Sequence, residues 1–439
     1  MKTQPITTSA LAELISDGDA AVLDCRPSAA YNGWPLRGEP RGGHIPGAVS
    51  FPAEWFGSLG EEKTGEFFAK KEFARDITIV VTGYGASDME TAAENLAALG
   101  FGPVRIHDVG MTGWLSDPVM PARTLPRFRN LVYPAWITSL LNGEPIFGET
   151  GEDGKIGKYV LAHVSFDNWG DYDLGHIPGA IWMDTLILED ENTWNRRTPE
   201  ELEEELCAHG ITKDTCVVLY GRTANPNMSQ EHPGKEAGQI GSMRAAMILK
   251  YAGVQDVRVL DGGLASWIRA GGDIAREETL PEPVESTGMN IPECPEFIVD
   301  MDEAKEMLAD PGSELVSMRS WPEFIGDVSG YHYVGPKGRI PGAVFGNCGS
   351  DAYHMENYRN HDDTMRSYHD IAADWRKIGI TPEKHIAFYC GTGWRASEAF
   401  YYARLMGWDN VSVYDGGWYE WSADPDNPTG QGIPPSSAG

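Results

Sequence analysis

Two short motifs occur three times each in this chain, always in the same order. The first motif, GHIPGA with arginine in place of histidine in the last copy, begins at Gly43, Gly175 and Gly338. The second motif, D-x-G-x-x-x-W, follows each copy of the first and begins at Asp108, Asp261 and Asp415. An ordered pair of motifs that recurs at three places indicates a triplicated structural unit. The length of 439 residues agrees with three domains of roughly 150 residues each.

Between the two motifs, each copy alternates short apolar segments with one helical segment. The first apolar segments are rich in branched and aromatic residues, as strands buried on both faces of a sheet are, and span 77–81, 216–220 and 385–389. The helical segments end at or next to a glycine, a common helix cap, and span 91–99, 242–251 and 396–406. The second strands span 104–107, 257–260 and 411–414. This order predicts right-handed crossovers and, in each domain, a doubly wound α/β fold with a mostly parallel sheet flanked by helices.

Proline-rich stretches separate the three copies. Residues 116–134 and 278–296 have the composition of linkers. Two polar insertions, 221–241 in the second copy and 347–369 in the third, are expected to be loops that cover a neighbouring cleft. The expected domains are domain 1 at 1–124, domain 2 at 125–285 and domain 3 at 286–439.

The composition is strongly acidic. Lys and Arg number 35 against 65 Asp and Glu, which gives a net charge of −30 and a pI near 4.7. Nucleic acids and anionic membrane surfaces are bound by basic surfaces, so neither is expected as a partner. The sequence has no run of about 18 apolar residues and no signal-like start. We therefore expect a cytoplasmic protein, or a periplasmic one if an export signal is missing from the sequence.

Six cysteines are sparse for this length, and they form neither C-x-x-C pairs nor zinc-ligand spacings. We therefore expect no disulfide framework, no metal site and no cofactor. One of the six, Cys390, directly follows the buried strand of the third copy. In the other two copies, that strand leads into Thr82-Gly83 and Gly221-Arg222. Because parallel sheets place their sites at the carboxyl ends of strands, Cys390 is the candidate nucleophile.

The loop from Cys390 to Arg395 has the composition of an anion-binding turn. A glycine-rich turn can direct its N–H groups inward, and the helix that follows it directs its positive end to the same point. Arg395 adds a cation, and together these features favour a thiolate, or a persulfide anion, at Cys390. We therefore predict Cys390 as the nucleophile and Arg395 as an electrostatic stabiliser. The predicted substrate-binding residues are Gly391, Thr392, Gly393 and Trp394.

The strand that ends in Cys390, the loop that closes on Arg395, the GHIPGA motif and the Asp-Gly-Gly motif together resemble the rhodanese family of sulfurtransferases. The resemblance covers nearly the whole chain, as three tandem rhodanese-like domains of which the third has the cysteine. It implies that Cys390 takes a sulfane sulfur from a donor and passes it on from a persulfide. Cysteine phosphatases share the topology but have five residues between Cys and Arg. The four residues here suit one sulfur atom better than a phosphate.

The donor and the acceptor remain open at this point. One interpretation is a small anionic donor such as thiosulfate with a thiol or cyanide as acceptor, and another is a mercaptopyruvate-type transferase. Thiosulfate enzymes of the family have an arginine near the position of Glu323, which argues against efficient thiosulfate use. A third interpretation belongs to a different class of function: the protein is a persulfide carrier, loaded by a cysteine desulfurase, that passes sulfur to an acceptor protein. The two copies without the cysteine favour such an interaction role.

Three neighbours of the loop have competing interpretations. Arg319 is expected to be a structural residue, because such arginines are commonly buried ion-pair partners. Trp394 either stands at the pocket mouth or packs against the neighbouring domain. Cys348 follows the last GHIPGA copy and is either an inert buried thiol or a resolving thiol for Cys390.

Overall fold

The chain folds into three five-stranded parallel sheets with flanking helices, which confirms the predicted fold class. The computed structural model describes residues 4–71, 77–150, 152–222 and 238–434. Most of the insertion predicted in the second copy, residues 223–237, lies outside the described residues. By its internal contacts the chain forms two compact units, residues 1–129 with 145–154 and residues 130–144 with 155–439. The first unit holds the sheet of domain 1, and the second holds the sheets of domains 2 and 3.

Each domain uses the same succession of strands and helices. The elements of domain 1 are β1 (Gln4–Ile6), α1 (Thr8–Asp17), β2 (Ala20–Asp24), α2 (Ser28–Asn32), β3 (Val49–Ser50), α3 (Trp55–Lys70), β4 (Thr78–Thr82), α4 (Ala86–Ala98), β5 (Val104–His107) and α5 (Gly110–Ser116). Those of domain 2 are β6 (Leu131–Val132), α6 (Pro134–Asn142), β7 (Tyr159–Ser165), α7 (Trp169–Asp173), β8 (Ile181–Asp184), α8 (Pro199–Ala208), β9 (Cys216–Tyr220), α9 (Gly238–Ala252), β10 (Asp256–Leu260) and α10 (Gly263–Arg269). Those of domain 3 are β11 (Ile298–Val299), α11 (Met301–Ala309), β12 (Ser313–Ser317), α12 (Trp321–Ile325), β13 (Val344–Phe345), α13 (Tyr368–Lys377), β14 (His385–Tyr389), α14 (Trp394–Leu405), β15 (Val411–Tyr414) and α15 (Gly417–Ala423).

The same strand order recurs in all three sheets. In domain 3 it is β11-β15-β14-β12-β13, and the described strand pairs are parallel. The strand that the sequence predicted to be buried on both faces, β14, lies at the centre, and β4 and β9 take the same place in the other sheets. Central strands have neighbours on both sides and helices on both faces, which explains their unbroken apolar sequences.

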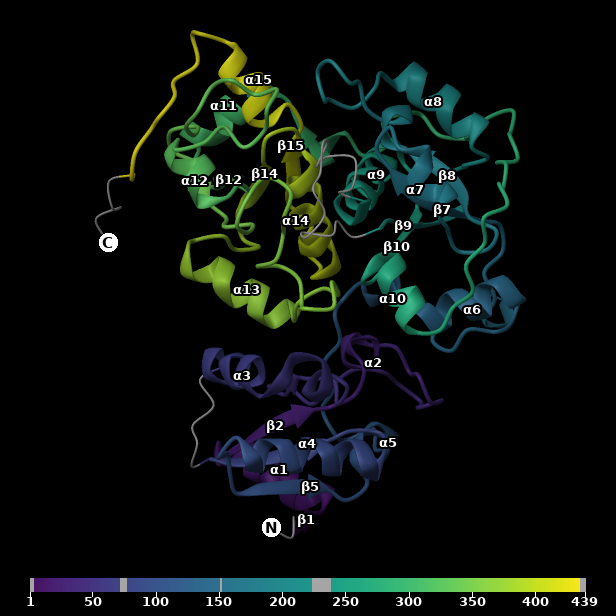
Figure 1. Cartoon of the computed structure of the whole chain (residues 1–439), viewed down its shortest axis with the longest axis vertical. Helices are drawn as coiled ribbons and strands as arrows, with labels where there is room; N and C mark the ends of the chain where they lie inside the picture. The colour runs from purple at the N-terminus through teal and green to yellow at the C-terminus, as the bar shows by residue number, and fades with distance from the viewer. Residues whose placement is uncertain (1–3, 72–76, 151, 223–237, 435–439) are drawn as a thin grey trace. The chain divides into compact units, whose positions relative to one another are not determined.

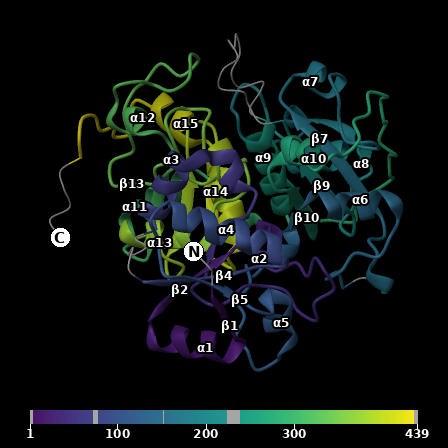
Figure 2. The same ribbon diagram turned by 60° about the horizontal axis from the view of Figure 1, so that its bottom comes forward.

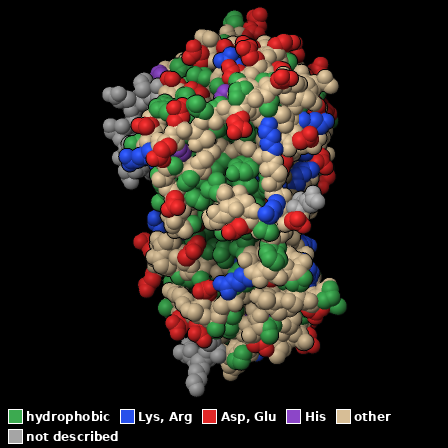
Figure 3. All heavy atoms as spheres, turned by 90° about the vertical axis from the view of Figure 1, so that its right-hand side faces the viewer, with side chains coloured by type: hydrophobic (Ala, Val, Ile, Leu, Met, Phe, Trp, Pro, Cys, Tyr) green, Lys and Arg blue, Asp and Glu red, His purple; other side chains and the backbone are tan. Residues whose placement is uncertain are grey.

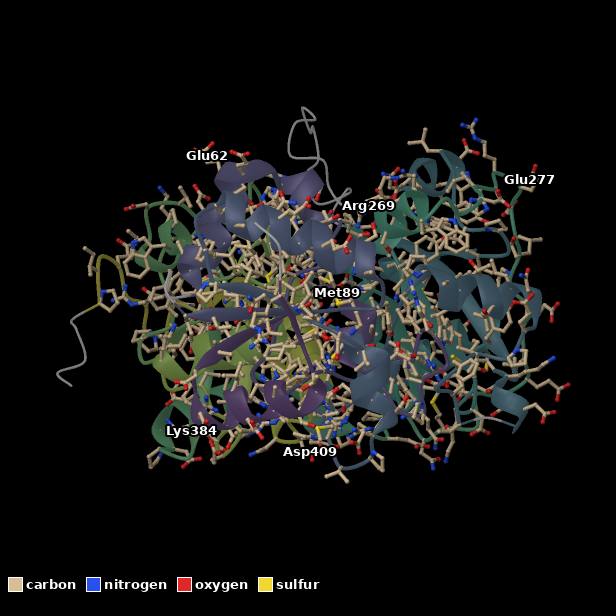
Figure 4. The ribbon with its side chains drawn as sticks, turned by 90° about the horizontal axis from the view of Figure 1, so that it is seen from below. Glu62, Met89, Arg269, Glu277, Lys384 and Asp409 are labelled. Carbon is tan, nitrogen blue, oxygen red and sulfur yellow. The ribbon has the colours of Figure 1, made fainter. Side chains whose placement is uncertain are left out.

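Helices cover both faces of the sheet in domain 1. Figure 2 shows α3 and α4 on one side of its strands and α1 on the other. The core on the first side joins Trp55 and Phe68 of α3 and Leu96 of α4 to Leu23 of β2. Met89 of α4, labelled in Figure 4, belongs to this core and is 5% exposed. Burial of these apolar side chains is what holds the helices to the sheet.

The GHIPGA motif ties the two ends of each domain together. Its second residue pairs antiparallel with the segment after the last helix of its domain, as His44 with Arg123, His176 with Ala275 and Arg339 with Gly430. In the first two copies, the imidazole also stacks on a tyrosine ring with the centroids 3.7 Å apart. Arg339 makes a different contact, because its Nη1 donates to the Gly432 carbonyl at 2.5 Å. The motif therefore recurs for a structural reason that all three domains share.

An arginine donates to the carbonyl of the first GHIPGA residue in every domain. The donors and acceptors are Arg26 and Gly43 at 2.7 Å, Arg222 and Gly175 at 3.1 Å, and Arg319 and Gly338 at 2.6 Å. Their carboxylate partners are Asp24, Asp171 and Glu323. In domains 1 and 3 the arginine follows the second strand, whereas in domain 2 it follows the central strand. The structural role predicted for Arg319 is confirmed.

The D-x-G-x-x-x-W motif supports the end of the central strand. The backbone N–H after the motif glycine donates to a carbonyl there, from Met111 to Gly83 at 2.9 Å, from Leu264 to Gly221 at 2.9 Å and from Trp418 to Cys390 at 2.8 Å. The motif glycines have positive φ angles, as in Gly417 with φ +55°. A Cβ at Gly417 would lie 2.8 Å from the carbonyl oxygens of Cys390 and Gly391, so this position requires glycine.

Domains 2 and 3 share an interface within the second unit. Helices α9 (teal) and α14 (yellow-green) pack side by side, as Figure 1 shows. The insertion of the third copy, 347–369, crosses to domain 2, where the Met365 N–H donates to Asp261 at 2.7 Å. A segment of domain 2 crosses the other way, where the Arg196 N–H donates to Asp415 at 2.8 Å. Each of these domains thus covers the second motif of the other.

The acidic charge is distributed over the surface. On the face in Figure 3, acidic side chains (red) lie scattered among basic and polar ones and form no single patch. Glu62 and Glu277, labelled in Figure 4, are exposed examples from the two units. Across the part of the chain that the structure describes, no helix is long and apolar enough to cross a membrane.

Candidate active site

Cys390 lies just after β14, the central strand of domain 3, where the sequence predicted a nucleophile. Its side chain is 0% exposed. The carbonyls of Cys390 and Gly391 accept backbone N–H groups from α15 at 2.8 and 2.9 Å. The following helix, α14, begins at Trp394 after Gly393, which has φ +84°. The turn that carries Cys390 is therefore fixed between α15 and the start of α14.

Arg395 points into a buried ion pair with Glu323 of α12. Its Nη1 and Nη2 each donate to one oxygen of Glu323 at 2.9 Å, and Arg319 donates to the same carboxylate at 3.3 Å. Burial opposes ionisation of Glu323, but the two guanidinium groups lower the pKa of this carboxyl to about 2. Glu323 is therefore charged at neutral pH, and the positive charge predicted at the loop is compensated by this carboxylate.

Tyr331 packs directly on the loop. A Cβ at Gly391 would clash with the Tyr331 ring, so a glycine is needed there. Nη2 of Arg395 donates to the Tyr331 hydroxyl at 3.3 Å, and this hydroxyl donates to the Ala352 carbonyl at 3.1 Å. Burial raises the pKa of Tyr331 well above the ordinary phenol value, against the opposing effect of Arg395. The phenol therefore stays protonated beside Cys390.

Cys348 contacts the same guanidinium group. Nη1 of Arg395 donates to the Cys348 Sγ at 3.2 Å, and the cysteine is 0% exposed. Burial raises the pKa of the Cys348 thiol to about 12. A protonated and fully buried thiol is a weak nucleophile, so this geometry favours a structural Cys348 over a resolving thiol.

A continuous series of aromatic rings borders the loop. Neighbouring centroids are between 5.2 and 5.9 Å apart in the order Trp394, Phe166, Trp194, Tyr333, Tyr331 and Tyr353. Phe166 and Trp194 come from domain 2, and the other rings come from domain 3. Tyr333 hydrogen-bonds Thr392 of the loop and is 37% exposed. We call these six side chains the aromatic series. The series extends from the Cys390 loop to the exposed ring of Tyr333.

Trp394 packs against domain 2, as one of its two interpretations predicted. Its Nε1 donates to both carboxylate oxygens of Glu189 at 3.0 Å. A Cβ at Gly241 of α9 would lie 3.3 Å from the Trp394 ring, so the indole lies close against that helix. Trp394 is 9% exposed and also begins the aromatic series. Domain 2 thus contacts the predicted site directly.

Domains 1 and 2 have other side chains at the corresponding place. In domain 1, the Tyr84 ring lies over the guanidinium groups of Arg26 and Arg37, at 5.2 and 4.7 Å from the ring centroid. In domain 2, Arg222 forms an ion pair with Asp171. The sequences there provide no thiol after the central strand, so neither domain can carry a persulfide at this position.

The structure places four of the six predicted site residues in the turn between β14 and α14, and the other two, Trp394 and Arg395, at the start of α14. Sequence reasoning did not assign Glu323, Tyr331 or the two rings from domain 2. Glu323 has a readable signal, because Ser320 and Glu323 form a capping box at the start of α12. Phe166 and Trp194 have no comparable signal, since they reach the loop through the packing of two domains.

A model of the rhodanese-like domain matches three stretches of the chain, residues 7–117, 154–270 and 300–424. These stretches include the central strands of all three sheets. The chain belongs to the rhodanese family. This rhodanese-family protein is 41% identical to the thiosulfate sulfurtransferase YnjE of Escherichia coli (strain K12) over 423 residues, which cover 94% of this chain and 90% of that protein.

Two similar solved structures are of proteins that were determined with small-molecule ligands. One is the anaerobic ergothioneine biosynthesis enzyme from Chlorobium limicola in complex with its natural substrate trimethyl histidine, with 48% identity over 99% of this chain and 100% of that chain and a TM-score of 0.93. The other is a variant of EanB with a cysteine persulfide, in a tetrahedral intermediate state with ergothioneine, with 48% identity over 98% of this chain and 100% of that chain and a TM-score of 0.93. The present chain is therefore an enzyme with the fold and sequence of a sulfurtransferase.

Gly417→Ala tests how the second motif supports the loop. The substitution should lower the free energy of unfolding by about 1–3 kcal/mol, because alanine is strained at positive φ. It should also slow sulfur transfer, because the new methyl group displaces the carbonyls of Cys390 and Gly391. Gly110→Ala places the same strain in domain 1 and is the matched control, with φ +56° in the wild-type protein. Urea unfolding should show a lower free energy of unfolding for both variants. Equal rates of sulfur transfer in the two variants would contradict the proposal that Gly417 supports the Cys390 loop.

Proposed function

We propose that this enzyme carries a sulfane sulfur on Cys390 and transfers it to the imidazole ring of a trimethylated histidine (hercynine), with ergothioneine as product. Cys390 is the nucleophile in this proposal, and the loop from Gly391 to Arg395 holds the persulfide. Two observations support the choice of acceptor. The aromatic series beside Cys390 suits a quaternary ammonium group, and 48% identity links the chain to a structure that contains trimethyl histidine.

In the loading step, the Cys390 thiolate attacks the outer sulfur of a donor such as thiosulfate or an inorganic polysulfide. The sulfur–sulfur bond of the donor breaks, and the electron pair leaves with sulfite or with the shortened polysulfide. Cys390 is then a persulfide anion, held in the turn between β14 and α14. Rhodanese chemistry of this kind needs a reactive cysteine at the end of a central strand, which is where Cys390 lies.

In the transfer step, the imidazole carbon between the two ring nitrogens forms a bond to the outer persulfide sulfur. The sulfur–sulfur bond breaks, the carbon loses its proton, and Cys390 returns to the thiol state. A carbon–sulfur bond replaces a carbon–hydrogen bond and the proton passes to the sulfur of Cys390, so the carbon is oxidised by two electrons and the persulfide is reduced by two. The protonated phenol of Tyr331 lies beside the loop and can donate a hydrogen bond during this step.

The aromatic series is the observation that carries the choice of acceptor. Trimethylammonium groups bind to the faces of aromatic rings, and such contacts contribute about 0.5–2 kcal/mol each. The half-buried Phe166 and Trp194 and the more exposed Tyr333 leave ring surface accessible near Thr392. A trimethylated histidine carries such a cation together with the imidazole ring that is to receive the sulfur.

The charges around the loop disfavour an acceptor that carries a net negative charge. Among the described residues, Arg395 belongs to the loop, Arg244 packs on it and Arg319 shares the carboxylate of Arg395, and each of the three forms an ion pair. None of the three is therefore available as an uncompensated cation for a bound dianion. Thiosulfate remains a candidate donor, since 41% identity to YnjE supports it.

The proposal is tested by product formation. The protein is incubated with hercynine and one donor at a time, namely thiosulfate, inorganic polysulfide, 3-mercaptopyruvate, or a cysteine desulfurase with cysteine. We expect a product that is one sulfur atom heavier than hercynine, detected by mass spectrometry. Unmethylated histidine should be used at least about tenfold less efficiently, because it lacks the quaternary ammonium group.

A matched pair of aromatic variants locates the acceptor. Tyr333→Ala should raise the KM for hercynine, whereas Trp321→Ala should leave it unchanged, although the two side chains are similarly exposed at 37% and 39%. Trp321 packs on Phe324 and Phe345 and is not part of the aromatic series. If Cys390 is loaded but no donor gives ergothioneine, the hercynine proposal fails. Transfer to thiols or to an acceptor protein would then be the better assignment.

A further inference from the structure

The indole of Trp394 has an unusual partner for a residue of the predicted loop. Its Nε1 is 3.0 Å from each oxygen of Glu189, which belongs to domain 2 and is 0% exposed. A charged acceptor makes this hydrogen bond stronger than one between neutral groups. The orientation of one ring of the aromatic series is therefore fixed by a carboxylate from a domain that has no cysteine at its own site.

Arg244 of α9 holds Glu189 in place. Its Nε donates to Glu189 at 2.9 Å, and its Nη1 donates to Asp415 of domain 3 at 2.6 Å. A Cβ at Gly393 would lie 2.8 Å from the same Nη1, so the guanidinium packs directly on the backbone of the loop. Arg244 is therefore a bridge between the Glu189 carboxylate, the second motif of domain 3 and the Cys390 turn.

The same arginine also fixes a second ring of the aromatic series. Nη2 of Arg244 donates to the Trp194 carbonyl at 2.9 Å. Trp194 has φ +61°, a backbone conformation that requires support from its surroundings, and its ring stacks on Tyr333 at 5.3 Å. Glu189 and Arg244 thus hold Trp394 and Trp194, the two residues whose rings flank Phe166 in the aromatic series.

Because Glu189 is buried, its contacts with Trp394 and Arg244 depend on the charge of its carboxylate. Desolvation raises the pKa of the Glu189 carboxyl to about 7, although Arg244 and Trp394 stabilise its ionised form. A glutamine at this position has one acceptor oxygen in place of two. In either orientation its NH₂ group would face a donor, because the Trp394 Nε1 lies 3.0 Å from both oxygen positions, and with the NH₂ at the Oε2 position Arg244 would lose its partner as well.

We propose that Glu189 is a positioning residue for the acceptor: it holds the Trp394 indole in the aromatic series and thereby sets the affinity for the quaternary ammonium substrate. This inference rests on the proposed function. It assigns domain 2 a part in acceptor recognition and none in sulfur loading, since no described contact of Glu189 involves Cys390. Glu189 acts through Trp394 and touches neither the persulfide nor the reacting carbon.

The experiment compares Glu189→Gln with Trp394→Phe, which keeps an aromatic ring but removes the N–H. Each variant should raise the KM for hercynine by about tenfold, the effect of losing one hydrogen bond to a charged group. The double variant should raise it no further, because both substitutions remove the same contact. The rate at which Cys390 gains a sulfur from the donor should stay at the wild-type value in Glu189→Gln, because Glu189 has no described contact with Cys390.

Glu398→Gln is the matched control. Glu398 lies on α14, the helix that packs on α9, is also 0% exposed, and forms an ion pair with Arg359 that does not involve Trp394. Both glutamine variants should melt earlier than the wild-type protein, but only Glu189→Gln should change the KM. A merely structural Glu189 would instead lower loading and transfer together, as loss of folded protein does.

The outcomes separate the two proposals. Wild-type turnover with an unchanged KM in Glu189→Gln would overturn the positioning role and leave the proposed function standing. An equal rise in KM for Glu398→Gln would also overturn it, because any damage to the interface would then suffice. A wild-type protein that makes no product from hercynine would overturn the proposed function and this inference with it.

Discussion

Cys390→Ser is expected to abolish sulfur transfer while the protein stays folded. The serine hydroxyl fits the volume of the thiol in this fully buried turn, and the backbone contacts of Cys390 with α15 are unaffected. A hydroxyl does not attack a sulfane sulfur at neutral pH as a thiolate does, so no persulfide forms. Intact mass spectrometry after incubation with a donor should show one added sulfur atom on the wild-type protein and none on the variant.

Cys25→Ser provides the matched control for this result. Cys25 is 3% exposed and lies in domain 1, close to Gly83 at the end of the central strand there. Burial raises the pKa of Cys25 well above the usual thiol value, so this cysteine should not be loaded. Sulfur on the Cys390→Ser protein, or its absence from Cys25→Ser, would refute the assignment of Cys390 as the sulfur carrier.

Glu323→Gln should be the most destabilising single substitution among those considered. It leaves the guanidinium groups of Arg319 and Arg395 buried without the carboxylate that both contact. Loss of one partner from a buried ion pair costs about 3–5 kcal/mol. Glutamine keeps the shape of the side chain and its place in the capping box of α12, so the measured loss in urea unfolding reports mainly the charge.

The low pKa of Glu323 also predicts that the free energy of unfolding depends on pH. The folded pKa of Glu323 is about 2, below the ordinary value of 4.5, so its contribution to stability is present above pH 4.5 and is lost as pH falls toward 2. The difference in stability between wild type and Glu323→Gln should therefore shrink across that range. Glu303→Gln is the control, since Glu303 has the same capping-box position in the exposed first turn of α11 and should change stability by less than about 0.5 kcal/mol. A difference that is constant with pH would contradict this explanation.

The repeated elements could be predicted because their signals are local. The apolar segments 385–389 and 411–414 coincide with β14 and β15, and the glycine at 407 marks the end of α14. The edge strands β3 and β13 were not predicted. Each has two residues, and such short strands form only because a neighbouring strand offers its edge.

The candidate site could be predicted only in part, for a similar reason. The position of Cys390 follows from a strand, a turn and a helix that are adjacent in sequence. The direction of the Arg395 side chain does not, because its partner Glu323 lies on α12, 72 residues earlier. Arg244 of domain 2 could not be assigned from its own sequence context, since its contacts with Asp415 and with the loop arise when α9 packs on α14.

The arginine that donates to the carbonyl of the first GHIPGA residue limits which halves of the three domains could be exchanged for one another. Domain 3 supplies it from the first half of its sequence, as Arg319, whereas domain 2 supplies it from the second half, as Arg222. A chimeric domain with the first half of domain 2 and the second half of domain 3 would contain neither arginine. The reciprocal chimera would contain both, and the two guanidinium groups would compete for one carbonyl. The halves of these homologous domains are therefore no longer interchangeable, and each copy can diverge further only as a whole.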